Sequence, residues 1–496
     1  MKTVTKGNPR RFLALPRILL DQTPRTSAML RSLLSLTAFA RPRMHLAPRM
    51  ASAADALGGP EIAVLGGGFG GLYTALRLCS LDWSGGPAPR VTLVDRSDRF
   101  AFSPMLYELA TGTATSWEVS PRYEDLLAGT QVEFVRAEVC GLDEAERVVT
   151  LRSGTAERQL PYDQCVLAFG LQPRTDAVPG VSEHALTFHS AEDALELKKQ
   201  LALAQHACRG TGTPLRIGII GGGYVGVELA ANLASALSAA HANGAPAPSV
   251  GRPGSCPPSS THPPQITLVH RSEQLLPGAQ PFSRDEAQRR LQSAGVELRL
   301  GTRVVNVTPE AISLVPTTAP DGAPVTELPV DLTVWSAGMC PSSVVPGLPL
   351  PLDARGRILA DATLRVRGHP RLFALGDAAA VVDARRVEAP PTAQAAMQQA
   401  DYVAWNVRAV VRGEALLPFR YENLGEMLSL GDQSATIAAL AQAVRLNGPV
   451  AYAVRRAVYA ARMPTSTQAA KVGLSWAVDA AFGAMRKAAQ LPDKRK

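Results

Sequence analysis

The sequence contains no closely spaced pair of cysteines. Its six cysteines are scattered over 496 residues, which is typical of a reducing compartment and excludes a redox centre built on two neighbouring thiols. Histidine and cysteine show no ligand spacing, so we predict no metal site. No apolar run reaches the roughly 18 residues that a membrane-spanning helix needs, and we expect no such helix.

Acidic residues are almost absent from the N-terminus. Residues 1–50 hold ten Lys or Arg and one acid, Asp21, so the net charge of +8 lies there and the remainder is close to neutral. We therefore expect no nucleic-acid partner, because such partners require basic side chains on the folded part. An arginine-rich, acid-poor segment is typical of an organellar transit peptide, which we assign to residues 1–57; a disordered basic tail is the alternative.

A glycine-rich turn, Gly66–Gly71, follows the apolar run Ile62–Leu65 and precedes a helix-like segment and a second strand that ends at Asp95. Glycines let the backbone approach a pyrophosphate at a helix N-terminus, and the acid accepts hydrogen bonds from a ribose. The later turn Gly376-Asp377 offers a polyol acceptor. Together these motifs predict non-covalently bound FAD. The contacting residues that we predict from them are Gly66, Gly68, Phe69, Gly71, Asp95, Gly376 and Asp377.

A second turn of the same type, Gly221–Gly226, predicts a site for NADPH or NADH, with Gly221, Gly223 and Gly226 against the pyrophosphate. The acid expected after the next strand is replaced by His270-Arg271. Arg271 can pair with the 2′-phosphate of NADPH; the alternative is a solvated arginine, with Glu273 as the ribose acceptor. Glu228, in the first turn of the next helix, either complements the helix dipole or lies near the nicotinamide and flavin rings.

The order of these motifs predicts an α/β fold with two Rossmann-like dinucleotide-binding domains, the second inserted in the first. A Pro-, Gly- and Ser-rich segment, Asn243–Pro264, reads as a disordered surface insertion. The predicted division is a transit peptide at 1–57, the FAD domain at 58–205 and 336–412, the NAD(P) domain at 206–335 with the insertion at 243–264, and a C-terminal region at 413–496.

The C-terminal region contains helix-like segments at 450–462 and 467–490. In the second, one face carries Leu474, Val478, Ala481, Phe482 and Met485. Such a helix can lie in a membrane interface. Packing on the protein's own core or on a dimer partner is the alternative. We expect a homodimer only on the general tendency of proteins to form symmetric pairs.

The chain resembles the type II NAD(P)H:quinone oxidoreductases, particularly their plant and algal plastid branch, over roughly residues 60–440. The segments that carry the resemblance are Ile62–Leu76, Phe102–Leu109, Gly221–Ala230, Trp335–Gly338 and Ala393–Gln399. It implies that Pro104 and Ala393 contact FAD, that Gly338 contacts NAD(P)H, and that Glu228 is catalytic. By spacing alone, Gln394 and Gln398 are a solvent-facing pair on a helix; the resemblance implies that their amides donate to quinone carbonyls.

The implied reaction is electron transfer from NAD(P)H through FAD to a lipophilic quinone, without proton pumping. Plastoquinone, a phylloquinone-type naphthoquinone and ubiquinone are the candidate acceptors. The leader and the family branch favour the chloroplast, at a plastoglobule or thylakoid surface, with the mitochondrial inner membrane, or both, as the alternative. Two other functions fit the motifs: a soluble ferredoxin-reductase-like flavoprotein, and an NAD(P)H-sensing flavoprotein with little turnover.

Overall fold

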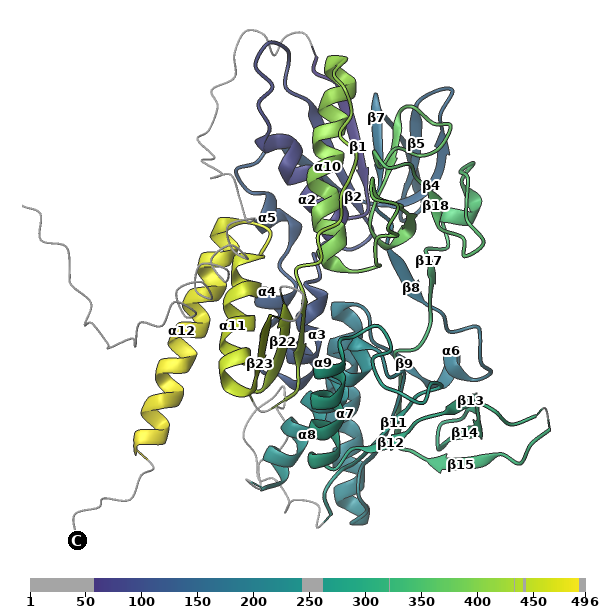
Figure 1. Cartoon of the computed structure of the whole chain (residues 1–496), viewed down its shortest axis with the longest axis vertical. Coiled ribbons are helices and arrows are strands. Elements are labelled where there is room, and N and C mark those ends of the chain that lie inside the picture. Colours follow the sequence, from purple (N-terminus) through teal and green to yellow (C-terminus); the bar gives the residue numbers. More distant parts are fainter. Residues whose placement is uncertain (1–57, 243–261, 321, 432, 440–442, 490–496) are drawn as a thin grey trace, which may run out of the picture. The chain divides into compact units, whose positions relative to one another are not determined.

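The computed structural model describes residues 58–242, 262–320, 322–431, 433–439 and 443–489 (Figure 1). The predicted transit peptide at 1–57 and residues 243–261 of the predicted insertion lie outside the described residues.

The first sheet contains the FAD-type glycine turn. Its five strands are all parallel, in the order β19 (Leu372–Ala374), β7 (Gln164–Leu167), β1 (Glu61–Leu65), β2 (Arg90–Asp95) and β3 (Val132–Arg136). The strands β1, β2 and β7 are almost completely buried, which is why they read as continuous apolar runs. Helices α2 (Phe69–Ser80) and α10 (Ala393–Arg412) pack against each other (Figure 1).

The second sheet contains the other glycine turn and is also parallel. Its order is β12 (Glu297–Arg299), β11 (Gln265–Val269), β10 (Arg216–Ile220), β16 (Leu332–Trp335) and β9 (Leu186–Thr187). The long helices of this part are α7 (Ala191–Thr211), α8 (Tyr224–Ala242) and α9 (Pro281–Ser293). Strand β9 precedes residue 206, so the second sheet draws on residues that the sequence assigned to the first domain. Because β19 returns to the first sheet, the second sheet is inserted within the first.

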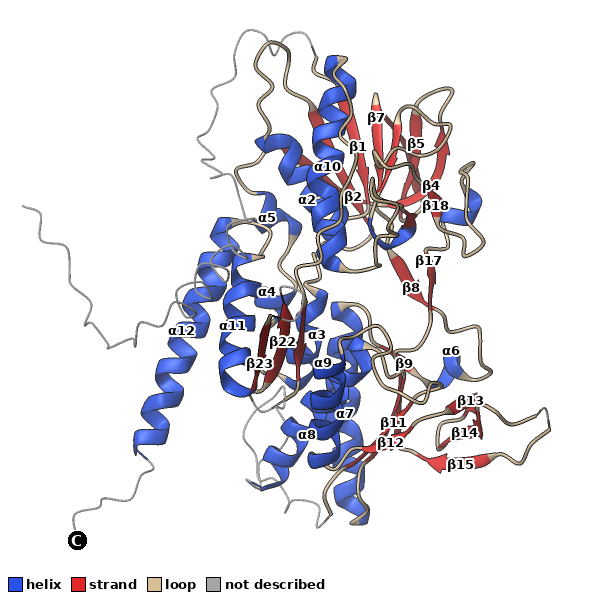
Figure 2. Ribbon diagram, viewed as in Figure 1, coloured by secondary structure: helices blue, strands red, loops and turns tan. Residues whose placement is uncertain are grey.

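Smaller sheets and short helices complete the two nucleotide-binding domains (Figure 2). The sheets are β4 (Glu138–Asp143), β5 (Val148–Ser153) and β6 (Ala156–Pro161), and β13 (Thr302–Val307), β14 (Ala311–Pro316) and β15 (Thr326–Pro329). Two-stranded pairs are β8 (Leu171–Pro173) with β17 (Met339–Pro341), which is antiparallel, and β18 (Ile358–Leu359) with β20 (Ala379–Ala380), which is parallel. The short helices are η2 (Ser103–Met105), α3 (Leu106–Thr111), α4 (Ser116–Val119), α5 (Tyr123–Leu127), α6 (Val181–His184), η3 (Val345–Gly347) and η4 (Gly376–Ala378).

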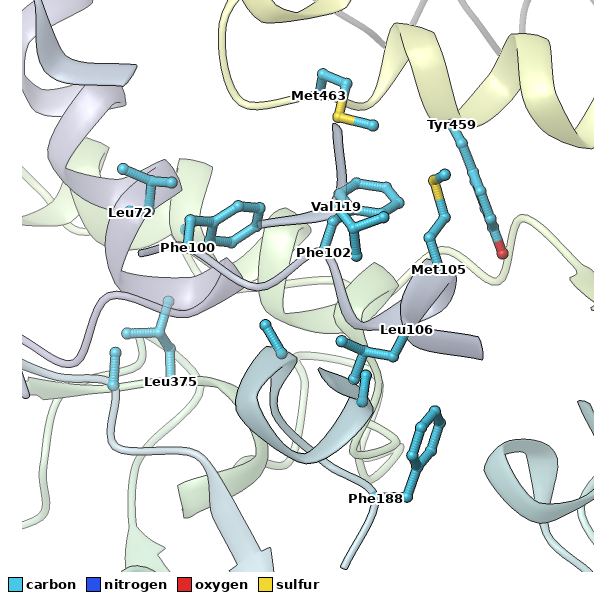
Figure 3. Packing of buried hydrophobic residues seen from close by; sticks show 14 of the residues in the cluster. Leu72, Phe100, Phe102, Met105, Leu106, Val119, Phe188, Leu375, Tyr459 and Met463 are labelled. Carbon is cyan, nitrogen blue, oxygen red and sulfur yellow. The ribbon is translucent and has the colours of Figure 1, made fainter. Parts of the chain in front are cut away.

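The C-terminal region has a small sheet that the sequence did not predict. It consists of β21 (Glu426–Ser429), β22 (Ala435–Ala439) and β23 (Val444–Asn447) in antiparallel order. Both predicted helices are present, as α11 (Gly448–Ala461) and α12 (Ser466–Ala489). Helix α11 packs on β22 and on α12. Tyr459 of α11 packs edge to face on Phe102, so the C-terminal region shares the core beside η2 (Figure 3).

Candidate nucleotide and electron-transfer sites

The first glycine turn is closed on one side and open on the other. A Cβ on Gly66, whose φ is +101°, would lie 2.3 Å from the Ala168 carbonyl oxygen, and a Cβ on Gly71 would lie 1.7 Å from the Gly66 carbonyl oxygen. A Cβ on Gly68, in contrast, would meet no atom within 4 Å. Gly68 is also the N-cap of α2, which has no side-chain cap and no acidic residue in its first turn. Free N–H groups at an open helix N-terminus favour an anion such as pyrophosphate.

Asp95 joins the end of β2 to this turn. Its Oδ2 accepts a hydrogen bond from the Gly67 N–H at 2.6 Å, and its Oδ1 accepts one from the Ser97 N–H at 2.8 Å. Burial raises the pKa of Asp95, while these donated hydrogen bonds act in the opposite direction. The Tyr123 hydroxyl donates to the Gly67 carbonyl at 2.8 Å and supports the turn from the other side. No sequence motif indicates Tyr123, because it reaches the turn from a separate short helix, α5.

A cavity of about 610 Å³ opens beside the turn and is large enough for a dinucleotide. Of the residues predicted to contact FAD, those that line this cavity are Gly66, Gly68, Phe69, Asp95, Gly376, Asp377 and Ala393. Gly71 and Pro104 are not among its lining residues. Gly71 instead packs on Gly66, and Pro104 lies in η2 beside Ser103, which does line the cavity. Tyr123 and His189 also line it and were not predicted.

The Gly376-Asp377 turn is held by helix α10. The Gly376 N–H donates to the buried Gln399 side-chain oxygen at 2.7 Å. Burial raises the pKa of Asp377 to about 6. This fits a carboxyl group whose hydrogen-bond partners are hydroxyl groups of a bound ligand. An open glycine, a helix N-terminus and two acceptor carboxyls therefore fit FAD; when bound, FAD takes electrons from the nicotinamide and passes them on.

The second glycine turn repeats this geometry. Gly221, with φ +120°, packs on Ser336, and a Cβ on Gly226 would lie 1.9 Å from the Gly221 carbonyl oxygen. A Cβ on Gly223 would meet no atom within 4 Å. Gly338 lies where the chain crosses back between the sheets, and its carbonyl accepts from the Arg174 N–H at 3.1 Å. The open position is thus Gly223, as Gly68 is in the first turn.

His270 occupies the place that Asp95 has in the first site. Its Nδ1 accepts a hydrogen bond from the Gly222 N–H at 3.1 Å, as Asp95 does from Gly67. Burial and then Arg271 lower the pKa of His270, so the neutral ring carries its hydrogen on Nε2. This Nε2 is buried without a partner among the described residues. His270 stands where the sequence analysis expected an acid. It is therefore a hydrogen-bond donor at the second site.

The two residues predicted as alternative contacts of the NAD(P)H ribose, Arg271 and Glu273, lie on the surface. Arg271 is exposed and has no ion pair among the residues that the structure describes. Glu273 is also exposed, and its carboxylate lies over Gly301, where a Cβ would be 2.3 Å from Oε1. The geometry brings His270 and Arg271 together at the end of β11, and turns Glu273 towards the start of β13.

Glu228 lies deeper than the sequence indicated. Helix α8 begins at Tyr224 and has no acidic residue in its first turn, so the placement of Glu228 in that turn was wrong. The Glu228 side chain is buried, and its Oε1 accepts from the Ser429 N–H at 2.8 Å. Burial is the main cause that raises its pKa to about 7. A carboxyl group that is half protonated near neutral pH is suited to proton transfer.

Gln394 and Gln398 do not face solvent as a free pair. The Gln394 side chain donates to the Gly425 carbonyl at 3.1 Å and accepts from the Leu424 N–H at 3.0 Å. Gln398 donates to the Glu422 carbonyl at 2.8 Å and accepts from the Glu422 N–H at 2.9 Å. Both amides therefore hold residues 421–425 against the N-terminal half of α10.

Two further observations concern a membrane-spanning helix and a metal ion. In the part of the chain that the structure describes, no helix is long and apolar enough to cross a bilayer. Across the same residues, no group of three or more His, Cys, Asp or Glu is placed to hold a metal ion.

Two parallel sheets, the second inserted within the first and each with an open glycine turn, define a flavoprotein oxidoreductase with one FAD and one NAD(P) domain. A family model for pyridine nucleotide-disulphide oxidoreductases matches residues 60–400. Among solved structures, NDH2 of Plasmodium falciparum in complex with NADH has a TM-score of 0.70 at 16% identity, over 83% of this chain and 96% of that one. Sulfide:quinone oxidoreductase of Aquifex aeolicus has a TM-score of 0.64 at 19% identity, over 82% and 92%. The predicted fold class is confirmed.

Curated relatives narrow this class. The chain is 38% identical over 418 residues to demethylphylloquinone reductase NdbB of Synechocystis, which covers 84% of this chain and 95% of that protein. It is 36% identical over 442 residues to alternative NAD(P)H-ubiquinone oxidoreductase C1, chloroplastic/mitochondrial, of Arabidopsis thaliana, covering 84% and 80%. The chain belongs to the type II NAD(P)H:quinone oxidoreductases within the pyridine nucleotide-disulphide oxidoreductase family. It is thus an FAD-dependent NAD(P)H:quinone oxidoreductase.

Proposed function

We propose that this enzyme takes electrons from NADPH as well as NADH and delivers them to a prenylquinone at a lipid surface. A phylloquinone-type naphthoquinone is the first candidate, because the Synechocystis relative is named a demethylphylloquinone reductase. Plastoquinone and ubiquinone are the alternatives. We place the enzyme in the chloroplast, at a plastoglobule or thylakoid surface, with the mitochondrial inner membrane, or both, as the second choice. The name of the Arabidopsis relative includes both organelles, and residues 1–57 have a transit-peptide composition.

The exposed apolar face of α12 carries the lipid-surface proposal. Val472 and Trp476 of this helix are buried, whereas Leu474 is 67% and Val478 44% exposed. Ala481 is exposed too, and the side chains of 482–489, including the predicted Phe482 and Met485, lie outside the described residues. An exposed apolar row on a helix that is anchored by its other face is suited to interfacial binding.

Trp117 is a further exposed aromatic side chain near the start of α12. It is 43% exposed, and its carbonyl accepts a hydrogen bond of 2.8 Å from the Gln468 side chain near the start of α12. Tryptophan is enriched where proteins meet the membrane interface. A lipophilic quinone is dissolved in the same layer, so docking through α12 and Trp117 would bring the enzyme to its acceptor.

We also assign the site residues. In the proposal, the seven predicted residues that line the first cavity contact FAD, Gly71 shapes the turn through its packing on Gly66, and Pro104 lies next to the lining residue Ser103. Gly221, Gly223, Gly226 and Gly338 keep their predicted role at the second site. Gln394 and Gln398 border the quinone pocket by holding residues 421–425, which leaves their direct donation to the quinone to be tested. Arg271 and the His270 Nε2–H both offer donors to a 2′-phosphate, and neither repels it as a carboxylate would.

The double variant Leu474→Glu with Val478→Glu tests the lipid surface. Burying a large aliphatic side chain contributes about 1.5–3 kcal/mol, so two charged replacements should lower the partition onto liposomes by roughly a hundredfold or more. We expect reduction of a long-chain quinone in liposomes to fall in parallel, while reduction of a short-chain, water-soluble quinone is unchanged. Flotation with liposomes and NADPH oxidation measure the two effects.

A matched control is Leu195→Glu with Leu203→Glu, two exposed leucines on α7, which should float with liposomes as the wild type does. If the α12 variant still floats, the attachment lies elsewhere. If it instead changes from dimer to monomer in light scattering, with liposome binding unaltered, the face is a dimer interface and the proposal fails.

Arg271→Ala tests the electron donor. A charge-assisted pair with a phosphate contributes about 1.5–3 kcal/mol, so kcat/KM for NADPH should fall roughly ten- to a hundredfold while NADH is nearly unaffected. Arg271→Lys should retain most of the NADPH activity, and Glu273→Gln should lower NADH activity only if Glu273 accepts from the ribose. Equal losses with both donors after Arg271→Ala would mean that Arg271 has a structural role.

A further inference from the structure

The two nucleotide-binding domains are joined by a short link. The chain leaves the first sheet through β8 and returns from the second sheet through β17, and these two strands pair with each other. Helix α3, which lies between β2 and β3 in the sequence and is buried, also packs on α7 and α8. Apolar packing is not directional, so these contacts alone leave one domain free to turn against the other.

The reaction requires a fixed relation between the domains. The NAD(P)H pyrophosphate is assigned to the space at Gly223, where α8 begins, whereas Ala393 and Ala396 of α10 line the FAD cavity. A misplacement of about 1 Å between reacting groups can cost roughly a hundredfold in rate. The placement of α8 relative to α10 is therefore part of the catalytic geometry.

Residues 421–429, which we call the clasp, are fastened to α10 through their first half. The side chains of Gln394 and Gln398 both bond to the clasp backbone, as described above. The Tyr421 hydroxyl donates to the Gln394 side-chain oxygen at 3.0 Å. Gln399 of the same helix accepts from the turn that lines the FAD cavity. The helix that holds the clasp thus also holds a wall of the FAD site.

The second half of the clasp is fastened to α8 and α9. The Glu426 carboxylate accepts from the Tyr224 hydroxyl at 2.7 Å and from the Gln280 N–H at 2.9 Å. Tyr224 is the first residue of α8, and Gln280 is the N-cap of α9. Further along α8, Glu228 accepts from the Ser429 N–H at 2.8 Å. One carboxylate, that of Glu426, therefore holds the starts of two helices of the NAD(P) domain.

The chain beyond the clasp is anchored on the FAD domain again. Arg455 of α11 has no exposed surface, and its guanidinium donates to the Glu108 carboxylate of α3 at 2.6 Å and to the Tyr107 hydroxyl. Tyr459 of the same helix packs on Phe102. A buried guanidinium is unfavourable unless it is paired, so this ion pair favours one placement of α11. The attachment to the NAD(P) domain therefore lies between two attachments to the FAD domain.

We propose that the clasp fixes the placement of α8 against the FAD cavity, with Glu426 as a positioning residue, and so brings the nicotinamide within reach of the flavin. Its hydrogen bonds are directional, so they define an orientation that the packing of α3 does not. Glu426 acts through Tyr224 and Gln280 rather than on the reacting atoms. The inference depends on the NAD(P)H dehydrogenase activity and not on which quinone or lipid surface the enzyme uses.

Glu426→Ala, in the full-length holoenzyme, releases the end of the clasp that holds the NAD(P) domain. We expect the rate at which saturating NADH reduces the flavin to fall by about a hundredfold, measured by stopped-flow absorbance. The Kd of NADH should be nearly unchanged, because the glycine turn itself is intact. Reoxidation of the dithionite-reduced enzyme by ferricyanide should also be unchanged.

Glu426→Gln should restore most of the rate, since its amide oxygen can accept from the Gln280 N–H and its amide nitrogen can donate to the Tyr224 oxygen. Tyr224→Phe removes one of the two bonds and should cause a smaller loss of the same kind, which decides the matter if Glu426→Ala does not fold. The matched control is Glu414→Ala, an exposed glutamate just beyond α10 that accepts from Arg408 at 3.0 Å. It should be reduced at the wild-type rate.

Gln394→Ala releases the other end of the clasp. If both ends belong to one device, this variant should also slow flavin reduction by NADH, and the double variant Gln394→Ala with Glu426→Ala should lose no more than the slower single variant. Unaltered flavin reduction in Gln394→Ala, or losses that multiply in the double variant, would mean that the two residues act separately and would overturn the proposal.

The placement of the domains can also be measured without NADH. Nitroxide labels are attached to the exposed Cys140 of β4 and to Leu203→Cys of α7, a position that is 55% exposed, with Cys256 replaced by serine. Electron spin resonance should give one narrow distribution of distances between the labels in the otherwise wild-type protein and a broader one after Glu426→Ala. The same distribution in both would contradict the proposal even if the activity falls.

Two further kinetic results would count against the clasp. A raised Kd for NADH with an unchanged reduction rate in Glu426→Ala would make this residue a support of the second glycine turn alone. An unchanged rate together with an unchanged Kd would leave Glu426 without a role in electron transfer from the nicotinamide.

Discussion

Gly223→Val should give a yellow protein that NADPH and NADH no longer reduce. A Cβ added at Gly223 meets no atom of the protein within 4 Å, so the fold and the FAD site should survive, but the valine would occupy the space at the start of α8 that we assign to the pyrophosphate. Losing two or more charge-assisted hydrogen bonds costs about 4 kcal/mol, or roughly a thousandfold in kcat/KM. Anaerobic mixing with NADPH, followed by flavin absorbance, measures the loss.

Dithionite provides the control, because it reduces the flavin chemically and should bleach the variant and the wild type equally. Gly347→Val, at another open position with no strained backbone, should be reduced by NADPH at the wild-type rate. Rapid bleaching of Gly223→Val by NADPH would show that the nicotinamide nucleotide binds elsewhere.

Gly68→Val should give a folded but colourless protein. Its Cβ also points into open space, at the turn between β1 and α2, and the valine would exclude the FAD pyrophosphate. Turnover should be lost with every acceptor, including ferricyanide. A ligand present at a hundred times its Kd stabilises a protein by about 2.7 kcal/mol, so the variant should also melt at a lower temperature than the holoenzyme. Flavin released on boiling, circular dichroism and a thermal melt test these points.

The contrast with Gly71 separates binding from folding. A Cβ on Gly71 would lie 1.7 Å from a backbone oxygen, so Gly71→Ala should fail to fold rather than lose flavin selectively. If Gly68→Val retains its full flavin content, the first turn does not hold the FAD pyrophosphate.

The sequence predicted those parts of the sites that are local. Each glycine turn lies between a buried strand and a helix within about thirty residues, and the spacing itself carries the chemistry. His270 shows the limit. Its role depends on a hydrogen bond to Gly222, 48 residues away, which exists because β10 and β11 are neighbours in register. The sequence showed the absent acid but not the ring that replaces it.

The contacts around Arg455 could not be predicted. An arginine on an amphipathic helix ordinarily faces solvent, and nothing in residues 448–461 distinguishes Arg455 from the adjacent Arg456 or indicates that its partner is Glu108 in α3. Gln394 and Gln398 show the same limit at shorter range: their hydrogen bonds to Gly425 and Glu422 span 31 and 24 residues, and the spacing of the two glutamines does not reveal them. Side-chain partners that tertiary packing selects have no periodicity to reveal them.

The pair of Arg455 with Glu108 joins positions 347 residues apart, and the Tyr73 hydroxyl donates to the Arg462 carbonyl 389 residues further along. Contacts of such separation form late, because a long loop must close before they are gained. An emerging chain that ends before α11 lacks the cation that pairs with Glu108 and leaves the face beside Phe102 uncovered. The packing of the nucleotide-binding part is therefore completed only when its last helices arrive.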